Sequence, residues 1–312
     1  SGKPVNIPSQ DMIIGVYYLT QVRDGLPGEN HVFASFDDAL HAYDCRSEVD
    51  MQAKIQVRVS AENANVINED GTRIFRVKNG KNEFVDYDVT GNKTARFETS
   101  IGRIIFNRNI PQDLGFVKRF NEDGTPSDKF FDYEITETCG KKLLGKIVDR
   151  TIKQYGFTIA AEVLDNIKAT GYKYSTRGSI TISIADMTVP EKKYSLIAET
   201  EQRVVDIEDQ YNMGFITDEE RYKLVVREWE KTTNDVTDAL TASLDKYNPI
   251  FMMADSGARG SMKQIRQLTG MRGLMANTAG KTIEIPIKAN FREGMSVLDY
   301  FTSSRGARKG LA

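Results

Sequence analysis

Apolar residues recur at helical spacing between residues 190 and 245, and dense charge separates them. The two narrow apolar stripes comprise Leu196, Ile197, Val204, Ile207 and Tyr211, and then Val225, Trp229, Val236, Leu240 and Leu244. Pro190 stands where a helix can start, and Gly214 separates the stripes. The pattern predicts two helices of roughly 20 to 25 residues joined by a short turn, an antiparallel hairpin over 191–245.

The second helix of this hairpin has a start signal. Thr217 to Glu220 match a capping box, in which a Thr hydroxyl and a Glu carboxylate bond amide groups at the helix start. The outer faces are densely charged, so the hairpin should project into solvent. Two interpretations stay open: a plain helical surface element, or a docking arm for another protein.

The N-terminal part mixes two periodicities. Residues 53–59 alternate apolar and polar positions, as a half-buried strand does, and a helix is expected near 36–44. The apolar run 12–19 fits either a buried strand or a short helix. Residues 60–137 are polar and predict a meander with exposed loops. Its turn signals are at 69–71, 78–80 and 122–124.

Helical spacing returns over 141–171, where Gly171 is a plausible C-terminal stop, and residues 180–184 alternate like another strand. The fold class predicted from these patterns is mixed α+β. It has a β-rich N-terminal region, a projecting antiparallel helical hairpin and a helical C-terminal segment.

Near the C-terminus the spacing of basic residues predicts a phosphate-friendly surface. Ser261 to Gln264 match a second capping box and open a helix expected to reach about Ala276. Arg259, Lys263 and Arg266 recur at intervals of four and three, which would place them on one face near the helix start. A merely solvated basic face is the alternative. Gly270 and Gly273 would each destabilise the predicted helix by about 1 kcal/mol relative to alanine. Glycines at such positions suggest that another backbone or a ligand approaches closely there.

A last helix is expected from about Met295 to the final residue, with Gly306 and Gly310 inside it. No capping residue follows Leu311 and Ala312, so the sequence has the character of a piece of a longer chain.

Charge distinguishes the hairpin from the C-terminal segment. Residues 191–245 carry 7 basic and 14 acidic side chains, whereas residues 246–312 carry 11 basic and 4 acidic ones, although the whole chain has a net charge of -2. An acidic middle and a basic end suggest separate tasks, and the basic end suits phosphates. No apolar run approaches the ~20 residues of a membrane span, so we expect a cytoplasmic protein.

Few residues offer conventional catalytic chemistry. The only cysteines, Cys45 and Cys139, form no metal-binding pair and are expected to be buried small hydrophobes. His31 and His41 lie among turn and helix-surface residues and should be solvated. No phosphate-cradling glycine loop or nucleophile elbow occurs. Hydrolase and metalloenzyme activities are therefore disfavoured.

The chain contains several long motifs: PSQDM at 8–12, GVYYLT at 15–20, MMADSGARGS at 252–261, QIRQL at 264–268, GMRGLMA at 270–276, NFREG at 290–294 and GARKGLA at 306–312. These motifs resemble those of the largest subunit (β′) family of bacterial DNA-directed RNA polymerases. The resemblance is strong over 1–58 and 173–312 and looser over 60–135.

The resemblance implies three regions. Residues 1–188 would form the pore domain of the secondary channel, and 189–285 the funnel domain, with the rim-helix hairpin 191–245 and the F-loop-region helix. Residues 286–312 would begin the cleft domain with the N-terminal half of the bridge helix. In the family this channel admits nucleoside triphosphates and takes backtracked RNA. The alternative function is a protein-docking module for secondary-channel transcription factors.

The same resemblance assigns roles to single residues. Arg259 would approach the triphosphate of the incoming nucleotide. The F-loop region would contribute Lys263, Arg266 and Arg272; the bridge helix would direct Arg305, Arg308 and Lys309 toward template DNA; and factors would dock at Gly214, Thr217 and Arg221. Arg305 replaces the family's usual histidine, which adds a positive charge. Residues 223–227 lack the family's alarmone-binding set, so that site is not expected.

The family's catalytic aspartate motif would precede residue 1, and its trigger loop would follow residue 312. No catalytic residue, metal or cofactor is therefore expected within the chain, the Mg²⁺ of the parent enzyme would be bound elsewhere, and the chain alone should be inactive. Implied partners are the β, α, ω and sigma subunits, template DNA, RNA and nucleoside triphosphates, and secondary-channel factors, but no membrane.

Overall fold

The computed structural model describes residues 4, 6–46, 48–58, 66–67, 73–78, 84–88, 96–123, 127, 129–277 and 279–311. The chain divides into two compact units. Unit 1 comprises residues 1–180 and 256–258, and unit 2 comprises residues 181–255 and 259–312. The division of the sequence into 1–188, 189–285 and 286–312 stays a prediction.

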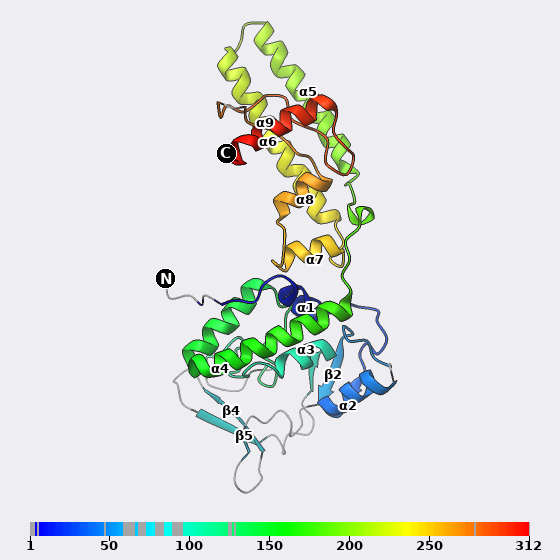
Figure 1. Cartoon of the computed structure of the whole chain (residues 1–312), viewed down its shortest axis with the longest axis vertical. Coiled ribbons are helices and arrows are strands. Elements are labelled where there is room, and N and C mark those ends of the chain that lie inside the picture. The colour runs from blue at the N-terminus through cyan, green and yellow to red at the C-terminus, as the bar shows by residue number, and fades with distance from the viewer. Residues whose placement is uncertain are drawn as a thin grey trace. The chain divides into compact units, whose positions relative to one another are not determined.

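Figure 1 traces the elements of both units. Those of unit 1 are α1 (Asp11–Thr20), β1 (Val32–Phe33), α2 (Phe36–His41), β2 (Ile55–Arg58), β3 (Val66–Ile67), β4 (Arg73–Lys78), β5 (Phe84–Asp88), β6 (Arg96–Thr99), α3 (Ile101–Asn107) and α4 (Lys141–Gly178). Those of unit 2 are a 3₁₀ turn (Ile184–Asp186), α5 (Lys192–Asn212), α6 (Asp218–Ser243), α7 (Pro249–Asp255), α8 (Met262–Thr269) and α9 (Val297–Leu311). The predicted mixed α+β class is confirmed.

The apolar run 12–19 forms helix α1, which packs against α4 in the core of unit 1. The two helices approach so closely that a Cβ added to Gly15 would lie 1.9 Å from the carbonyl oxygen of Gly171. Gly171 is therefore not the predicted helix stop. The helix continues to Gly178, and Gly171 serves a close approach of two backbones.

Helix α4 consists of two consecutive helical segments. Gly156 interrupts it with a φ of 81° and a ψ of -175°, a conformation that is open essentially to glycine alone. Leu144 and Ile147 from the first segment and Val163 and Ile167 from the second are buried in one apolar cluster of unit 1.

The predicted strand at 53–59 is confirmed as β2, in which Ile55 and Val57 are buried. It pairs in parallel with β1 and antiparallel with β6, where Val57 faces Phe97. The expected helix near 36–44 is confirmed as α2. The Ser35 hydroxyl accepts a bond from the Asp38 amide at its start, and a π-helical turn, Ala42–Arg46, follows it.

The polar stretch 60–137 contains the predicted meander, since β3, β4 and β5 pair antiparallel in that order. The predicted turn glycines at 71, 80 and 124 lie outside the described residues. The prediction missed helix α3, which Ser100 caps by accepting a bond from the Arg103 amide. It also missed a buried ion pair, Arg119 to Glu134 at 3.0 Å. Burial lowers the pKa of Arg119, although Glu134 opposes that shift.

The strand predicted at 180–184 is wrong. Residues 180–183 have no regular structure, and a 3₁₀ turn begins at Ile184. Ile182 and Ile184 are exposed, so the alternating pattern does not correspond to a half-buried sheet.

The helix predicted to reach Ala276 ends at Thr269, because Gly270 stands at its C-terminal cap. Gly273 lies beyond it with a φ of 86° and forms an antiparallel bridge with Ile287. Ser261 makes no side-chain capping bond, so the second capping box is also wrong. The predicted last helix is confirmed as α9.

The two cysteines differ in their surroundings. Cys139 is buried as expected, and desolvation raises the pKa of its thiol. Cys45 is exposed, which contradicts the prediction, and its sulfur lies 3.4 Å from Nδ1 of His41. His31 and His41 are both exposed, as expected. Among the described helices, none has the length and apolar character that a membrane crossing requires.

Candidate functional site in the hairpin unit

The helical hairpin of unit 2 closes along a narrow apolar seam, and Figure 1 shows α5 and α6 running antiparallel. Ile197, Val225, Trp229 and Val236 are buried in this seam. Polar contacts accompany it, since the Thr200 and Thr232 hydroxyls lie 2.6 Å apart. The hairpin and the capping box of Thr217 with Glu220 are confirmed, and so are both stripes except for Tyr211, which is exposed.

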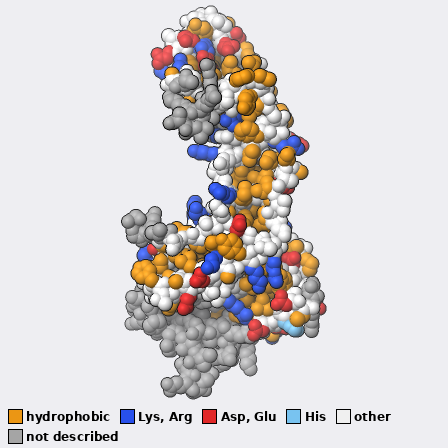
Figure 2. All heavy atoms as spheres, in the orientation of Figure 1, with side chains coloured by type: hydrophobic (Ala, Val, Ile, Leu, Met, Phe, Trp, Pro, Cys, Tyr) orange, Lys and Arg blue, Asp and Glu red, His pale blue; other side chains and the backbone are white. Residues whose placement is uncertain are grey.

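The tip of the hairpin turns at Gly214, whose φ is 79°. Its amide donates to the carbonyl of Tyr211 at 2.9 Å. Met213 and Phe215, on either side of the glycine, are 69% and 75% exposed. Figure 2 shows hydrophobic and charged side chains mixed at this end of the hairpin. The tip can therefore offer two large apolar side chains to a partner.

Arg221 is not a free cation on this surface. Its guanidinium donates to Asp218 at 2.8 Å and to Glu284 at 2.6 Å, and it lies over the ring of Tyr211. The hydrogen bond to Glu284, followed by that to Asp218, raises the pKa of Arg221. The residue fastens a later segment of the chain to the hairpin, a role that its sequence position did not reveal.

That later segment, residues 273–288, is called the strap. Antiparallel bridges join Gly273 to Ile287 and Ala276 to Thr282. The Tyr222 hydroxyl donates to the Thr282 carbonyl at 2.9 Å, and Lys288 pairs with Glu201. The strap is thus attached to both helices of the hairpin.

A buried lysine makes a further attachment, just after the strap. Lys193 is 1% exposed, and its ammonium lies 2.5 Å from a carboxylate oxygen of Glu293. The Tyr194 hydroxyl donates to the other oxygen at 2.6 Å. Burial alone would raise the pKa of Glu293, but the bonds from Lys193 and Tyr194 hold it below its ordinary value. Lys193 lies at helical spacing from Ile197 and Thr200, on the face of α5 that is buried. A charged residue on the apolar face of a predicted helix is the signal that could have identified it.

The basic residues 259, 263 and 266 do not form one helical ridge. Arg259 lies in the turn before α8, where its amide donates to the Met253 carbonyl at 3.2 Å, and only Lys263 and Arg266 lie on the helix. Positive φ values at Gly257 and Gly260 shape that turn. Arg259 and Lys263 are exposed, and neither forms an ion pair with any described residue.

The structure brings Arg266 and Arg272 together instead. Both line a cavity of about 310 Å³, whose other lining residues are Glu230, Thr233, Asn234 and Leu274. Arg272 lies beyond α8 with its guanidinium 4.9 Å from the centre of the Phe291 ring.

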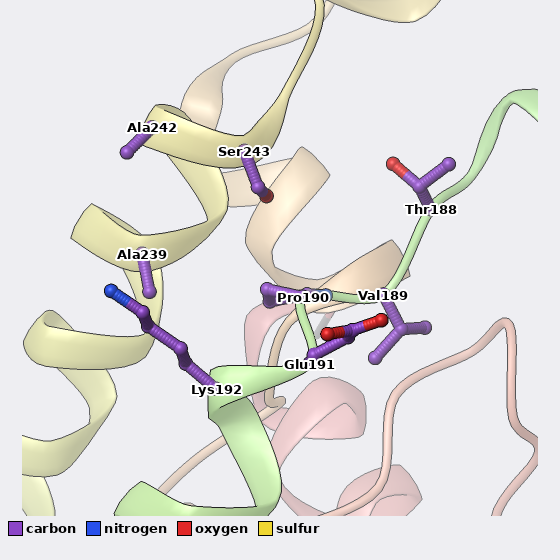
Figure 3. A pocket seen from close by; sticks show the side chains of 8 residues that line it. All are labelled: Thr188, Val189, Pro190, Glu191, Lys192, Ala239, Ala242 and Ser243. Carbon is purple, nitrogen blue, oxygen red and sulfur yellow. The ribbon is translucent and has the colours of Figure 1, made fainter.

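A second hollow of about 490 Å³ lies where the chain enters α5, against the last turns of α6. Figure 3 shows Lys192 directed toward Ala239, whereas Glu191 points toward Val189. Its polar groups diverge, so this hollow lacks the converging donors and acceptors of a specific ligand site.

The predicted DNA-facing residues Arg305, Arg308 and Lys309 lie in α9, and the positions of their side chains are outside the description. The earlier turns of α9 expose Val297, Leu298, Tyr300 and Phe301 by 61% to 79%. Within the described residues, no group of three or more His, Cys, Asp or Glu side chains could hold a metal ion.

Comparison with known proteins assigns both halves of the chain to one kind of polypeptide. The family model for RNA polymerase Rpb1 domain 3 matches residues 1–187, and that for RNA polymerase Rpb1 domain 4 matches residues 216–292. The DNA-directed RNA polymerase β′ subunits of Acetivibrio thermocellus, Caldicellulosiruptor saccharolyticus and Clostridium perfringens are each 49% identical to it over 311 residues. Each match covers 100% of this chain and 24% of the relative, so the chain spans about a quarter of their length.

Proposed function

Because the chain belongs to the RNA polymerase Rpb1 family and resembles bacterial β′ subunits along its whole length, we propose that it is a channel-forming part of a DNA-directed RNA polymerase. In this proposal it lines the secondary channel, through which nucleoside triphosphates enter and backtracked RNA leaves. The observation that carries the proposal is the 49% identity to β′ subunits across 311 residues.

Arg259 is proposed to meet the triphosphate of the incoming nucleotide. Its side chain is exposed and has no ion-pair partner among the described residues, and two positive-φ glycines shape its turn. A free guanidinium can bind phosphate oxygens in a bidentate manner. In the complete polymerase, Arg259→Ala should raise the triphosphate concentration for half-maximal nucleotide addition about tenfold, which corresponds to about 1.4 kcal/mol.

Single-nucleotide addition at limiting triphosphate measures this effect. Lys246→Ala removes an exposed basic side chain outside the proposed sites and is the matched control. Equal kinetics for Arg259→Ala and the control would count against the assigned role.

The α9 helix is proposed to be the N-terminal half of the bridge helix, with Arg305, Arg308 and Lys309 toward template DNA. Four large apolar side chains are exposed on its first turns, and exposed apolar surface of this kind favours packing against other parts of an assembly. The proposed assembly partners are the β, α, ω and sigma subunits. Catalytic Mg²⁺ would be bound by β′ residues outside this chain, so the chain alone should not polymerise nucleotides.

A second function, the docking of secondary-channel transcription factors, is favoured by the hairpin tip. Gly214 sets the turn that exposes Met213 and Phe215, Thr217 caps the following helix, and Arg221 fastens the strap. In the complete polymerase, Phe215→Ser should weaken binding of a transcript-cleavage factor by about tenfold or more, as loss of an apolar anchor does.

Fluorescence titration of the labelled factor measures this affinity. Phe157→Ser, at an 80% exposed position of unit 1, is the control for loss of an exposed phenyl ring. Equal affinity for both variants and the parent polymerase would exclude the tip as the docking surface.

A further inference from the structure

The cavity between α6, α8 and the start of the strap contains two arginines that have no ion-pair partner among the described residues. Arg266 and Arg272 both line it, and neither forms an ion pair with any described residue. The Nε atom of each is buried and has no hydrogen-bond partner in that part of the chain. Guanidinium groups only donate hydrogen bonds, so these two need an acceptor that the described residues do not supply.

The environment of Arg272 strengthens this point. Burial lowers the pKa of Arg272, and no neighbouring charge contributes to the shift. The ring of Phe291 lies 4.9 Å from its guanidinium, which leaves the edges of the group for a ligand in its plane. An oxyanion with several oxygens fits two such forks better than a single neutral acceptor does.

We propose that this cavity binds a phosphoryl group, free phosphate or diphosphate or the terminal phosphates of a nucleotide, with Arg266 and Arg272 as its paired donors. A volume of about 310 Å³ is at the small end of the range for ligand pockets, which suits a small anion. A small rotation of each side chain would turn the Nε–Nη edge toward the anion and satisfy the buried donors. Thr233 and Asn234 from α6 complete a polar wall.

Glu230 sets the strength of this site. It lines the cavity from the exposed face of α6 and forms no ion pair with either arginine. A carboxylate at the rim repels an anion and so weakens its binding, and salt should weaken binding further because it screens the attraction between the anion and the two arginines. Removing the charge of Glu230 should therefore tighten binding.

Binding is tested directly on the full chain, so its failure would leave the proposed polymerase function untouched. Inorganic diphosphate is titrated while the ¹⁵N–¹H signals of arginine Nε groups are recorded by NMR. Saturable binding with Kd in the millimolar range or tighter is expected, together with shifts of two Nε signals. Arg272→Ala should weaken binding at least tenfold, and Glu230→Gln should tighten it about threefold. Arg227→Ala removes an exposed charge on α6, the helix that carries Glu230, and should change the affinity by less than twofold.

Arg272→Lys keeps the charge but loses the fork, so it should bind several-fold more weakly even if Arg272→Ala does not fold. Titration with a nucleoside triphosphate distinguishes the sources, since a nucleotide site would favour it over diphosphate. Non-saturable binding, or equal loss in Arg227→Ala and Arg272→Lys, would overturn the proposal. The proposal would also be overturned if diphosphate bound to the isolated chain but not to the complete polymerase, because a protein carboxylate would then occupy the cavity.

Discussion

The two units hold their helices together by different means. In unit 1, α1 and α4 approach until the Gly15 position has no room for a side chain, and apolar clusters surround the crossing. In unit 2, a narrow seam joins α5 to α6, and charged pairs such as Lys193 with Glu293 fasten the rest of the chain to them. The α1–α4 crossing of unit 1 should therefore be sensitive to added volume, whereas the attachment of the later chain to the hairpin of unit 2 should be sensitive to the loss of a charge.

The largest expected effect comes from disrupting the close packing of α1 against α4 in unit 1. Gly15→Ala should destabilise unit 1 by about 4 kcal/mol or more, because its Cβ would lie 1.9 Å from a backbone oxygen and the helices would have to separate. Hydrogen exchange measured by mass spectrometry on peptides of α1 and α4 reports the loss.

Gly145→Ala in α4 is the matched control. A Cβ there meets nothing within 4 Å, so this variant should be neutral or stabilised by up to about 1 kcal/mol through helix propensity. Equal protection of α1 and α4 in both variants would contradict the close-packed crossing.

A smaller effect is expected from breaking the ion pair between Lys193 and Glu293 in unit 2. Glu293→Gln should destabilise unit 2 by about 2 to 3 kcal/mol at pH 7, because it leaves the buried Lys193 ammonium without its counter-ion. The sole tryptophan, Trp229, is buried in the hairpin seam, so its fluorescence during urea unfolding reports unit 2.

The pH dependence sharpens this test. The pKa of Glu293 is lowered in the folded state, so its contribution is complete above the ordinary value of 4.5 and is lost as pH falls through the lower folded-state pKa. As pH falls below about 5, the parent unit 2 should therefore lose a stabilisation that Glu293→Gln already lacks. Parallel stability curves for the two proteins would show that the pair does not act as described.

The smallest effect concerns the hairpin turn. Thr217→Ala should lower the free energy of unfolding by about 1 kcal/mol, because it removes the hydroxyl that accepts a hydrogen bond from the Glu220 amide at the start of α6. Thr241→Ala, on the exposed face of the same helix, should change stability by less than about 0.5 kcal/mol. Urea unfolding followed at Trp229 separates these outcomes, and equal losses would exclude a capping role.

The sequence predicted the hairpin well because its information is local. The two stripes, Gly214 and the Thr217 capping box each specify structure within a few residues of themselves. The strand predicted at 180–184 failed because period-two alternation indicates a sheet only where a partner strand exists. Gly171 failed as a stop because its purpose, contact with α1, depends on residues far away in the sequence.

The candidate site shows the same limit. The positive charges at Arg259, Lys263 and Arg266 were apparent from spacing, but Gly270 ends α8 early and brings Arg266 beside Arg272 instead. The pairing of Arg221 with Glu284 could not be predicted, because the strap has no periodicity that places it on the hairpin. The resemblance supplied roles for these residues that their spacing alone could not.

The strap has a consequence for how unit 2 loosens. The described residues of 270–296 contain no helix or strand, yet contacts at Thr282, Glu284, Lys288 and Glu293 divide the segment into short closed loops. Each contact that forms shortens the loop that the next must close, and each halving of loop length saves about 0.6 kcal/mol of chain entropy. Loss of one contact lengthens the loop for its neighbours, so the segment should be released cooperatively rather than one contact at a time.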